Sequence, residues 1–233
     1  MQYTDMETKI TYKGKSFTKD YGKGSTKDYG KGSYDIIEII ERQQHNKLSN
    51  LKIEYGDLIQ MIFKSEINYI LHQCNCCSIT KRDYNNKIEN GANGFAKILF
   101  DQIIDADIYC KRPKHKFDDK YFLYIDQPGT ISISGSKYKV INSFSQFTYG
   151  KTNSLGRLNI LNKLKYHIEY AKRENWIENI KNFESPEQRI EWFKICLEKT
   201  VLEVPEDSII GIPWKNGCNL GGGNWNIYYD MYI

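Results

Sequence analysis

Two glycine-rich stretches carry residue types suited to binding phosphate groups. Residues 215–225, KNGCNLGGGNW, follow the apolar run 209–213, and residues 90–94, NGANG, precede a predicted helix. Fixing glycine is entropically costly and gives no side chain to pack, so such clusters indicate backbone that approaches something closely. Backbone N–H groups at a helix start suit phosphate oxygens, and we interpret the late cluster as binding a diphosphate. The chain has no Walker motif, and too few residues follow residue 225 for a dinucleotide-binding βαβ unit.

Two polar residues occupy the ends of predicted strands. Asp57 follows the strand 51–55, and Asn75 closes the nearly continuous apolar strand 67–75. Further strands are predicted at 130–134, 139–144 and 208–213, and helices at 94–104, 158–173 and 225–232. Strands that alternate with helices predict an α/β layered fold with a largely parallel sheet, whose ligands bind beyond the carboxyl ends of the strands.

One more helix has a clear start signal. Ser185 is the expected N-cap, Pro186 occupies the first turn, and Gln188 lies three residues after the cap. Its expected buried stripe is Ile190, Phe193 and Leu197.

The first part of the chain has a different character. TKDYGKGS occurs twice in tandem, at 18–25 and 26–33, and such a unit cannot bury a core, so we predict a disordered tail over 1–34. One interpretation of the repeat is a slippage product without function. The other is a weak tether for anions or RNA that stacks through Tyr21 and Tyr29. Residues 35–50 are predicted to form a short helix, capped by Asp35, and a linker, and residues 51–233 the main domain.

Charge and composition restrict the class of protein. The net charge is +4, and residues 1–33 contribute most of it, with seven lysines and four acidic residues. The folded part is therefore not expected to bind nucleic acid. The chain has no apolar run of membrane-spanning length and no signal-like N-terminus, so we expect no membrane partner and a location in the cytoplasm. The six cysteines are expected to be thiols; a zinc site, which needs C-x-x-C pairs, is the alternative, and we expect neither a metal nor a cofactor.

Several motifs together resemble one family. HQCN at 72–75, NGANGFAK at 90–97, INSFSQFTYGK at 141–151 and IPWKNGCNLGGGNW at 212–225 look like a macro domain, as does Gly-Asp-Leu at 56–58. EWFKICLEK at 191–199 resembles the branch found in phages, microbes and large DNA viruses, which implies host cytoplasm if the chain is viral. The resemblance covers about residue 51 to the C-terminus. It implies a three-layer α/β/α sandwich with a mixed, largely parallel sheet that binds ADP-ribose.

The resemblance also implies roles for individual residues. A buried Asp57 carboxylate would accept a hydrogen bond from the adenine amino group, and Asn75 would hold the distal ribose and orient a water. The two glycine loops would enclose the diphosphate and distal ribose through Gly91, Asn93, Gly94, Phe95 and Ala96 on one side, and Gly217, Cys218, Asn219, Leu220, Gly221 and Gly222 on the other. Asn219 stands where the family has glycine, and Asn224 where it often has an acid, which puts catalysis in doubt more than binding.

Each of these residues also has a purely structural interpretation. Asp57 is alternatively a helix cap, Asn75 a turn residue, and residues 221–223 a flexible connection. His72 is interpreted as a buried structural histidine, and Trp225 as an anchor for the last helix. The clustered cysteines at 74, 76 and 77 are interpreted as small core residues.

Three functions follow from these observations. The first is a hydrolase that acts on an ADP-ribosyl ester or amide, or on ADP-ribose 1″-phosphate. The second is a non-catalytic module that binds ADP-ribose, its polymer or an ADP-ribosylated protein. The third is an RNA-binding protein that uses the repeat tail. Whether the chain is an enzyme is left open.

Overall fold

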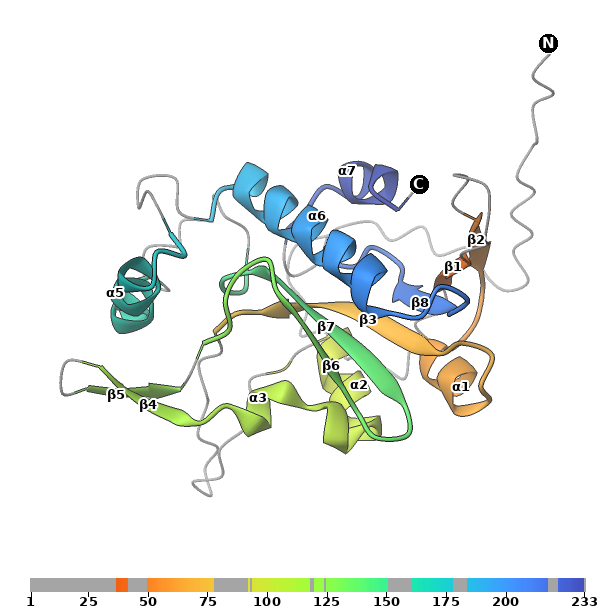
Figure 1. Ribbon diagram of the computed structural model, residues 1–233, viewed down its shortest axis with the longest axis horizontal. Helices are drawn as coiled ribbons and strands as arrows, with labels where there is room; N and C mark the ends of the chain where they lie inside the picture. The colour runs from red at the N-terminus through yellow and green to blue at the C-terminus, as the bar shows by residue number, and fades with distance from the viewer. Residues whose placement is uncertain are drawn as a thin grey trace, which may run out of the picture. The chain divides into compact units, whose positions relative to one another are not determined.

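A six-stranded mixed sheet forms the centre of the fold (Figure 1). The computed structural model describes residues 37–41, 50–77, 92, 94–117, 120–123, 125–150, 161–177, 184–217 and 222–232. The strands of this sheet are β1 (Ile37–Glu41), β2 (Asn50–Glu54), β3 (Tyr69–Asn75), β6 (Ile131–Ser134), β7 (Lys139–Gln146) and β8 (Ile210–Pro213). Their order across the sheet is β2-β1-β8-β3-β7-β6. The predicted tail, residues 1–34, lies outside the described residues.

The parallel part of the sheet is confined to its centre. β3 pairs in parallel with β7 on one side and with β8 on the other. β1 pairs antiparallel with both β2 and β8, and β6 pairs antiparallel with β7. The predicted α/β class and mixed sheet are confirmed, but the sheet is less parallel than predicted.

The helix predicted near residues 36–40 is wrong, because residues 37–41 form strand β1. Isoleucine is β-branched and favours strands, and this segment has a hydrogen-bonding neighbour on each side. Tertiary pairing therefore overrides the capping signal of Asp35. β1 joins the same sheet as the domain that was predicted to begin at residue 51.

Helices pack on both faces of the sheet. The described helices are α1 (Leu58–Phe63), α2 (Phe95–Gln102), α3 (Ile108–Lys111), α5 (Lys165–Arg173), α6 (Pro186–Glu203) and α7 (Trp225–Asp230), with a 3-10 turn at Ile104–Ala106. In Figure 1, α6 and α7 lie on one side of β3 and β7, and α1, α2 and α3 on the other. A separate antiparallel hairpin, β4 (Lys114–Phe117) with β5 (Lys120–Leu123), follows α3 and was not predicted.

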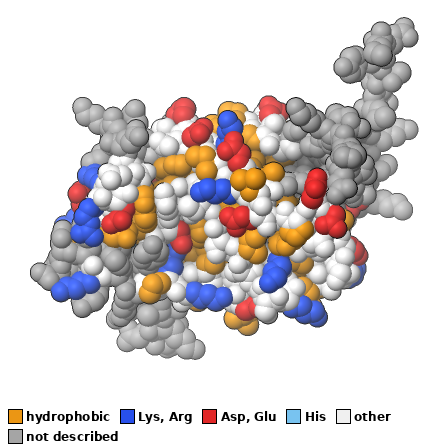
Figure 2. Space-filling model, in the orientation of Figure 1, with side chains coloured by type: hydrophobic (Ala, Val, Ile, Leu, Met, Phe, Trp, Pro, Cys, Tyr) orange, Lys and Arg blue, Asp and Glu red, His pale blue; other side chains and the backbone are white. Residues whose placement is uncertain are grey.

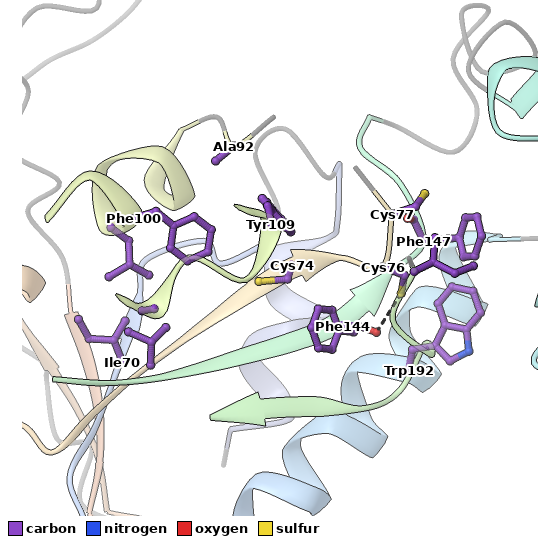
Figure 3. Close-up of a cluster of buried hydrophobic side chains, with 14 of the residues drawn as sticks. Ile70, Cys74, Cys76, Cys77, Ala92, Phe100, Tyr109, Phe144, Phe147 and Trp192 are labelled. Carbon is purple, nitrogen blue, oxygen red and sulfur yellow. Dashed lines mark hydrogen bonds between the residues drawn. The ribbon is translucent and has the colours of Figure 1, made fainter. Parts of the chain in front are cut away.

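The alternation of β3 separates two buried clusters. Ile70 belongs to the cluster that includes Phe100 of α2 and Tyr109 of α3 (Figure 3). Leu71, the next residue, belongs to the cluster that includes Phe193 of α6 and Tyr228 of α7. Neighbouring strand residues point to opposite faces, so β3 is covered by helices on both faces, as its continuous apolar sequence predicts.

Helix α6 begins as predicted, but its buried stripe differs. The Ser185 hydroxyl accepts a hydrogen bond from the Gln188 backbone N–H at 3.2 Å, and Pro186 opens the first turn. Phe193 is buried as predicted, whereas Ile190 and Leu197 are only partly buried. The buried residues also include Arg189. A hydrophobic pattern cannot indicate a charged residue as buried; Arg189 is buried because an ion pair with Glu184 neutralises its charge.

Gly211 allows β8 to pack closely against α1. A Cβ atom at this position would lie 2.3 Å from Leu58 Cδ1 and 2.7 Å from Ile67 Cδ1. We therefore expect Gly211→Ala to lower the free energy of unfolding by about 1–3 kcal/mol through overpacking. Chemical denaturation of the variant measures this loss. Leu58→Ala removes the nearer of these side chains, so the double variant should lose less stability than the two single losses together; strict additivity would contradict the packing argument.

Candidate functional site

The carboxyl ends of three parallel strands meet at one edge of the sheet. β3 ends at Asn75, β7 at Gln146 and β8 at Pro213, and their parallel pairing points all three ends the same way. The segments that follow them therefore start along a common edge. Ligands of α/β sheets bind at such an edge, and Asn75, a site residue predicted from the sequence, lies there.

Asn75 is held at three points. Its backbone N–H donates to the Tyr109 hydroxyl at 2.9 Å, and its carbonyl accepts from Arg112 Nη2 at 2.6 Å. Its side-chain Oδ1 accepts from Gln146 Nε2 at 2.5 Å. Within the described part of the chain, Asn75 Nδ2 has no hydrogen-bond partner, and the residue is partly exposed. Asn75 is thus a rigidly held residue that presents an amide donor, which a simple turn residue does not require.

An ion pair between a buried arginine and a partly buried aspartate fixes the end of β3. Arg112 donates from Nε and Nη2 to Asp126 Oδ2 at 2.9 and 2.6 Å, and its guanidinium lies 4.6 Å from the Tyr109 ring centroid. Burial opposes the charge, but the Asp126 carboxylate keeps the pKa of Arg112 above its ordinary value. The Asp126 backbone N–H also donates to the Cys76 carbonyl at 2.9 Å. The two paired residues therefore donate hydrogen bonds to two successive backbone carbonyls, those of Asn75 and Cys76.

A second buried ion pair fixes the segment after β7. Arg189 donates from Nε and Nη2 to Glu184 Oε1 at 2.9 and 2.6 Å. The same guanidinium donates to the carbonyls of Thr148 and Gly150 at 2.9 and 3.0 Å, and Glu184 Oε1 accepts from the Thr148 N–H at 3.0 Å. Burial lowers the pKa of Arg189 to about 10, which leaves it charged at neutral pH. The loops after β3 and β7 are therefore both held by an arginine–carboxylate ion pair that hydrogen-bonds to their backbone.

Asp57 is the N-cap of α1. Its Oδ1 accepts hydrogen bonds from the backbone N–H groups of Ile59 at 2.9 Å and Gln60 at 3.3 Å. The structural interpretation as a helix cap is confirmed. Asp57 is exposed, so the expected burial of its carboxylate is wrong. The cap uses one carboxylate oxygen, and no hydrogen bond to Oδ2 is found among the described residues.

The first glycine loop ends at a position that only glycine adopts readily. Gly94 precedes α2 with φ 59° and ψ −136°, outside the regions open to residues with a Cβ. Phe95 and Ala96 are the first residues of α2 and are partly buried. Gly91 and Asn93 lie outside the described residues.

The second glycine loop is described at its two ends. Gly217 and Gly222 both have φ 73°, and the Gly223 N–H donates to the Gly217 carbonyl at 3.2 Å, which closes the loop on itself. Gly217 lies against Gln73 of β3: a Cβ there would meet Gln73 Oε1 at 1.9 Å. Four further predicted residues, Cys218, Asn219, Leu220 and Gly221, lie outside the described part of the chain.

An aromatic pair flanks this loop. The ring centroids of Trp214 and Trp225 are 4.7 Å apart, and Trp225 also contacts Tyr229 and Tyr232. The interpretation of Trp225 as an anchor of the last helix is confirmed.

Sequence reasoning missed the supporting residues of the site. Gln146, Tyr109, Arg112 and Asp126 surround Asn75 but come from distant positions, and only Gln146 lay inside a quoted motif, 141–151. Gln73 lies in the quoted motif HQCN but was given no role. Its side-chain Nε2 and Oε1 are buried without a hydrogen-bond partner in the described structure.

A Cys–His–Asn group lies beside the site but is not suited to nucleophilic catalysis. His72 Nε2 is 2.9 Å from Asn142 Oδ1 and 3.3 Å from Cys74 Sγ, and all three residues are buried. Burial lowers the pKa of His72 to about 4 and raises the pKa of the Cys74 thiol well above its ordinary value. A reactive cysteine needs the thiolate form, whereas here both groups are neutral. The interpretation of His72 as a structural histidine is confirmed.

The cysteines form no cluster with metal-ligand character in the described residues. Cys74, Cys76, Cys77 and Cys196 are buried, Cys110 is exposed, and none of these five forms a disulfide. The Cys76 thiol contacts the Phe144 carbonyl (Figure 3). The Cys77 thiol contacts the Phe147 carbonyl. No group of three or more His, Cys, Asp or Glu residues in the described structure is arranged to hold a metal.

Comparison with protein-family models, with curated proteins and with solved structures finds no match to this chain. Among the helices formed by described residues, none has the length and apolar character needed to cross a membrane.

Protonation of His72 should make stability depend on pH. Because the folded state keeps His72 neutral, with a pKa of about 4 against 6.5 for the ordinary side chain, the unfolded chain binds the proton more tightly. As far as His72 is concerned, the free energy of unfolding is highest above pH 6.5. It falls by at most about 3 kcal/mol as the pH drops towards 4. Denaturation at pH 7.5 and 4.5 measures the loss. His72→Gln is the non-titrating control, and an equal loss in the variant would contradict this assignment.

Proposed function

We propose that residues 51–233, together with β1, form a macro domain that binds ADP-ribose at the carboxyl edge of the parallel strands. The observation that carries the proposal is that three hydrogen bonds hold Asn75 while its side-chain amide donor is available at that edge. A ribose hydroxyl oxygen is a matching acceptor. Support also comes from the ordered resemblance of the HQCN, NGANGFAK and IPWKNGCNLGGGNW motifs to that family.

The glycine conformations fit a ligand with an extended anionic part. Gly94, Gly217 and Gly222 all have positive φ, in two loops that join onto the elements carrying Asn75 and its neighbours. Backbone amides exposed by such turns suit phosphate oxygens, which accept hydrogen bonds only. Gly91, Asn93, Cys218, Asn219, Leu220 and Gly221 complete these loops in the proposal.

Asp57 suits the adenine end of the ligand. Its carboxylate is exposed, and the oxygen that does not cap α1 can accept a hydrogen bond from the adenine amino group. A base with a carbonyl at the same position, such as hypoxanthine, offers an acceptor instead and would be rejected.

Hydrolysis of an ADP-ribose derivative is the second candidate, favoured by the rigid anchoring of Asn75, which would hold the distal ribose in one orientation. The described groups around Asn75 offer no evident general base. Tyr109 is buried with its pKa raised well above the ordinary value, and Asp126 is engaged by Arg112. A binding module without turnover is the alternative.

Binding to nucleic acid has less support. On the face that Figure 2 displays, basic and acidic side chains of the described residues are interspersed. A nucleic-acid interface concentrates Lys and Arg on one surface. The repeat tail, which carries the RNA-binding alternative, lies outside the described residues.

Calorimetric titration of the full chain tests the binding proposal. We expect a micromolar Kd for ADP-ribose, about −8 kcal/mol, and weaker binding of its inosine analogue. Asp57→Ser keeps a good N-cap residue but removes the carboxylate, so it should bind ADP-ribose roughly tenfold more weakly and lose the preference for adenine. Absence of heat and of thermal stabilisation at millimolar ADP-ribose would reject the proposal.

Turnover separates the enzyme from the binding module. An ADP-ribosyl ester peptide and ADP-ribose 1″-phosphate would each be incubated with the chain, and release of ADP-ribose measured by chromatography. If the chain is a hydrolase, Asn75→Ala should lower kcat by at least about 10²-fold, because an unoriented ribose loses the near-attack geometry. Binding without release of product by the unaltered chain would leave the binding module as the function.

A further inference from the structure

Gln146 meets Asn75 where the regular pairing of two strands ends. It is the last residue of β7 and faces Asn75 in the register, just after a shift between Gln73 and Asn75. Its carbonyl accepts from the Cys76 N–H at 2.8 Å, so its backbone is also bonded to the residue that follows β3. The residue is only 8% exposed.

The hydrogen bond between the two side chains has a definite direction. Gln146 Nε2 donates and Asn75 Oδ1 accepts, at 2.5 Å. This leaves Gln146 Oε1 buried without a partner in the described part of the chain. An amide has one acceptor oxygen and one donor nitrogen, so engaging the oxygen of Asn75 leaves its nitrogen as the group that faces a ligand.

We infer that Gln146 is a positioning residue that sets the hydrogen-bond polarity of Asn75, a role that rests on the proposed binding of ADP-ribose. Gln146 turns the acceptor of Asn75 inward and its donor outward. A ligand therefore meets a donor, and the site selects a sugar hydroxyl that offers its oxygen. Asn75, with its acceptor already engaged by Gln146, holds the sugar and does not take a proton from water.

The unpaired Gln146 oxygen argues for this role over a purely structural one. A buried polar atom without a partner is unfavourable, and a pair selected for stability alone would satisfy both of its ends. Arg112 and Tyr109 already hold the backbone of Asn75. Gln146 is the residue among these that determines the state of the side chain.

Two variants separate the polarity of Asn75 from its mere presence. Gln146→Met keeps the length of the side chain and removes the hydrogen bond. Gln146→Glu replaces the donor by a carboxylate, which only accepts when ionised, so at pH 8 Asn75 must turn its nitrogen inward and its oxygen outward.

A measurement without ligand tests whether Gln146 fixes the orientation of the Asn75 side-chain amide. In chain labelled with ¹⁵N-asparagine, the Asn75 side-chain signal is identified by its absence in Asn75→Ala. We expect its amide protons to exchange rapidly with water in the unaltered chain and to be protected in Gln146→Glu, with Gln146→Met differing from both in chemical shift. Identical shifts and exchange rates in all three proteins would overturn the inference.

Calorimetry with ADP-ribose and ADP then tests the role in recognition, since ADP lacks the distal ribose that Asn75 would hold. Each Gln146 variant should weaken ADP-ribose about tenfold and leave ADP unchanged. In an Asn75→Ala background, Gln146→Met should have no further effect. Equal weakening of both ligands, or additive effects, would assign Gln146 a structural role and overturn the inference. If the unaltered chain binds neither ligand, the proposed function fails, while the labelled-amide measurement still decides whether Gln146 sets the polarity of Asn75.

Discussion

The ion pair of Arg112 and Asp126 is the interaction on which the end of β3 depends. A strand that runs out of ladder partners leaves backbone groups that must be satisfied, and burying a guanidinium is costly unless it is paired. Here one pair of residues meets both requirements. Asp126 neutralises the charge of Arg112. Arg112 donates to the Asn75 carbonyl, and the Asp126 N–H donates to the Cys76 carbonyl. The orientation of Asn75 at the end of β3 is therefore fixed by the ion pair of Arg112 and Asp126.

Arg189 and Glu184 repeat this arrangement after β7, so two neighbouring loops start from fixed backbones. The glycine loops are of a different kind: their positive φ angles let the backbone turn sharply, and their amides rather than their side chains would meet a ligand. Fixed side chains at strand ends and backbone amides at glycine turns are complementary ways of binding. The first suits a sugar whose hydroxyl positions are fixed, and the second suits a flexible diphosphate.

Local signals in the sequence predicted local structure well. Ser185 begins α6 as expected, the apolar pattern found β3, β7 and β8, and the residues at the strand ends include Asn75 at the candidate site. Signals that depend on distant partners were not readable. Arg112 and Asp126 are 14 residues apart and Gln146 lies 71 residues from Asn75, so no local pattern marks them as neighbours. The isoleucines of β1 resembled a capped helix because a strand with a neighbour on each side is specified by those neighbours, not by its own period.

The strand order also bears on how the chain is made. β8 is the last strand of the sheet in sequence, yet it lies between β1 and β3. While the chain is being synthesised, β1 and β3 each carry an open hydrogen-bonding edge until β8 leaves the ribosome, and the two halves of the sheet are not joined. Open edges invite pairing with other chains, so a nascent or prematurely terminated product is the aggregation-prone form. Chaperones that shield strand edges would therefore act on this protein from the emergence of β1 and β3 until β8 has been synthesised.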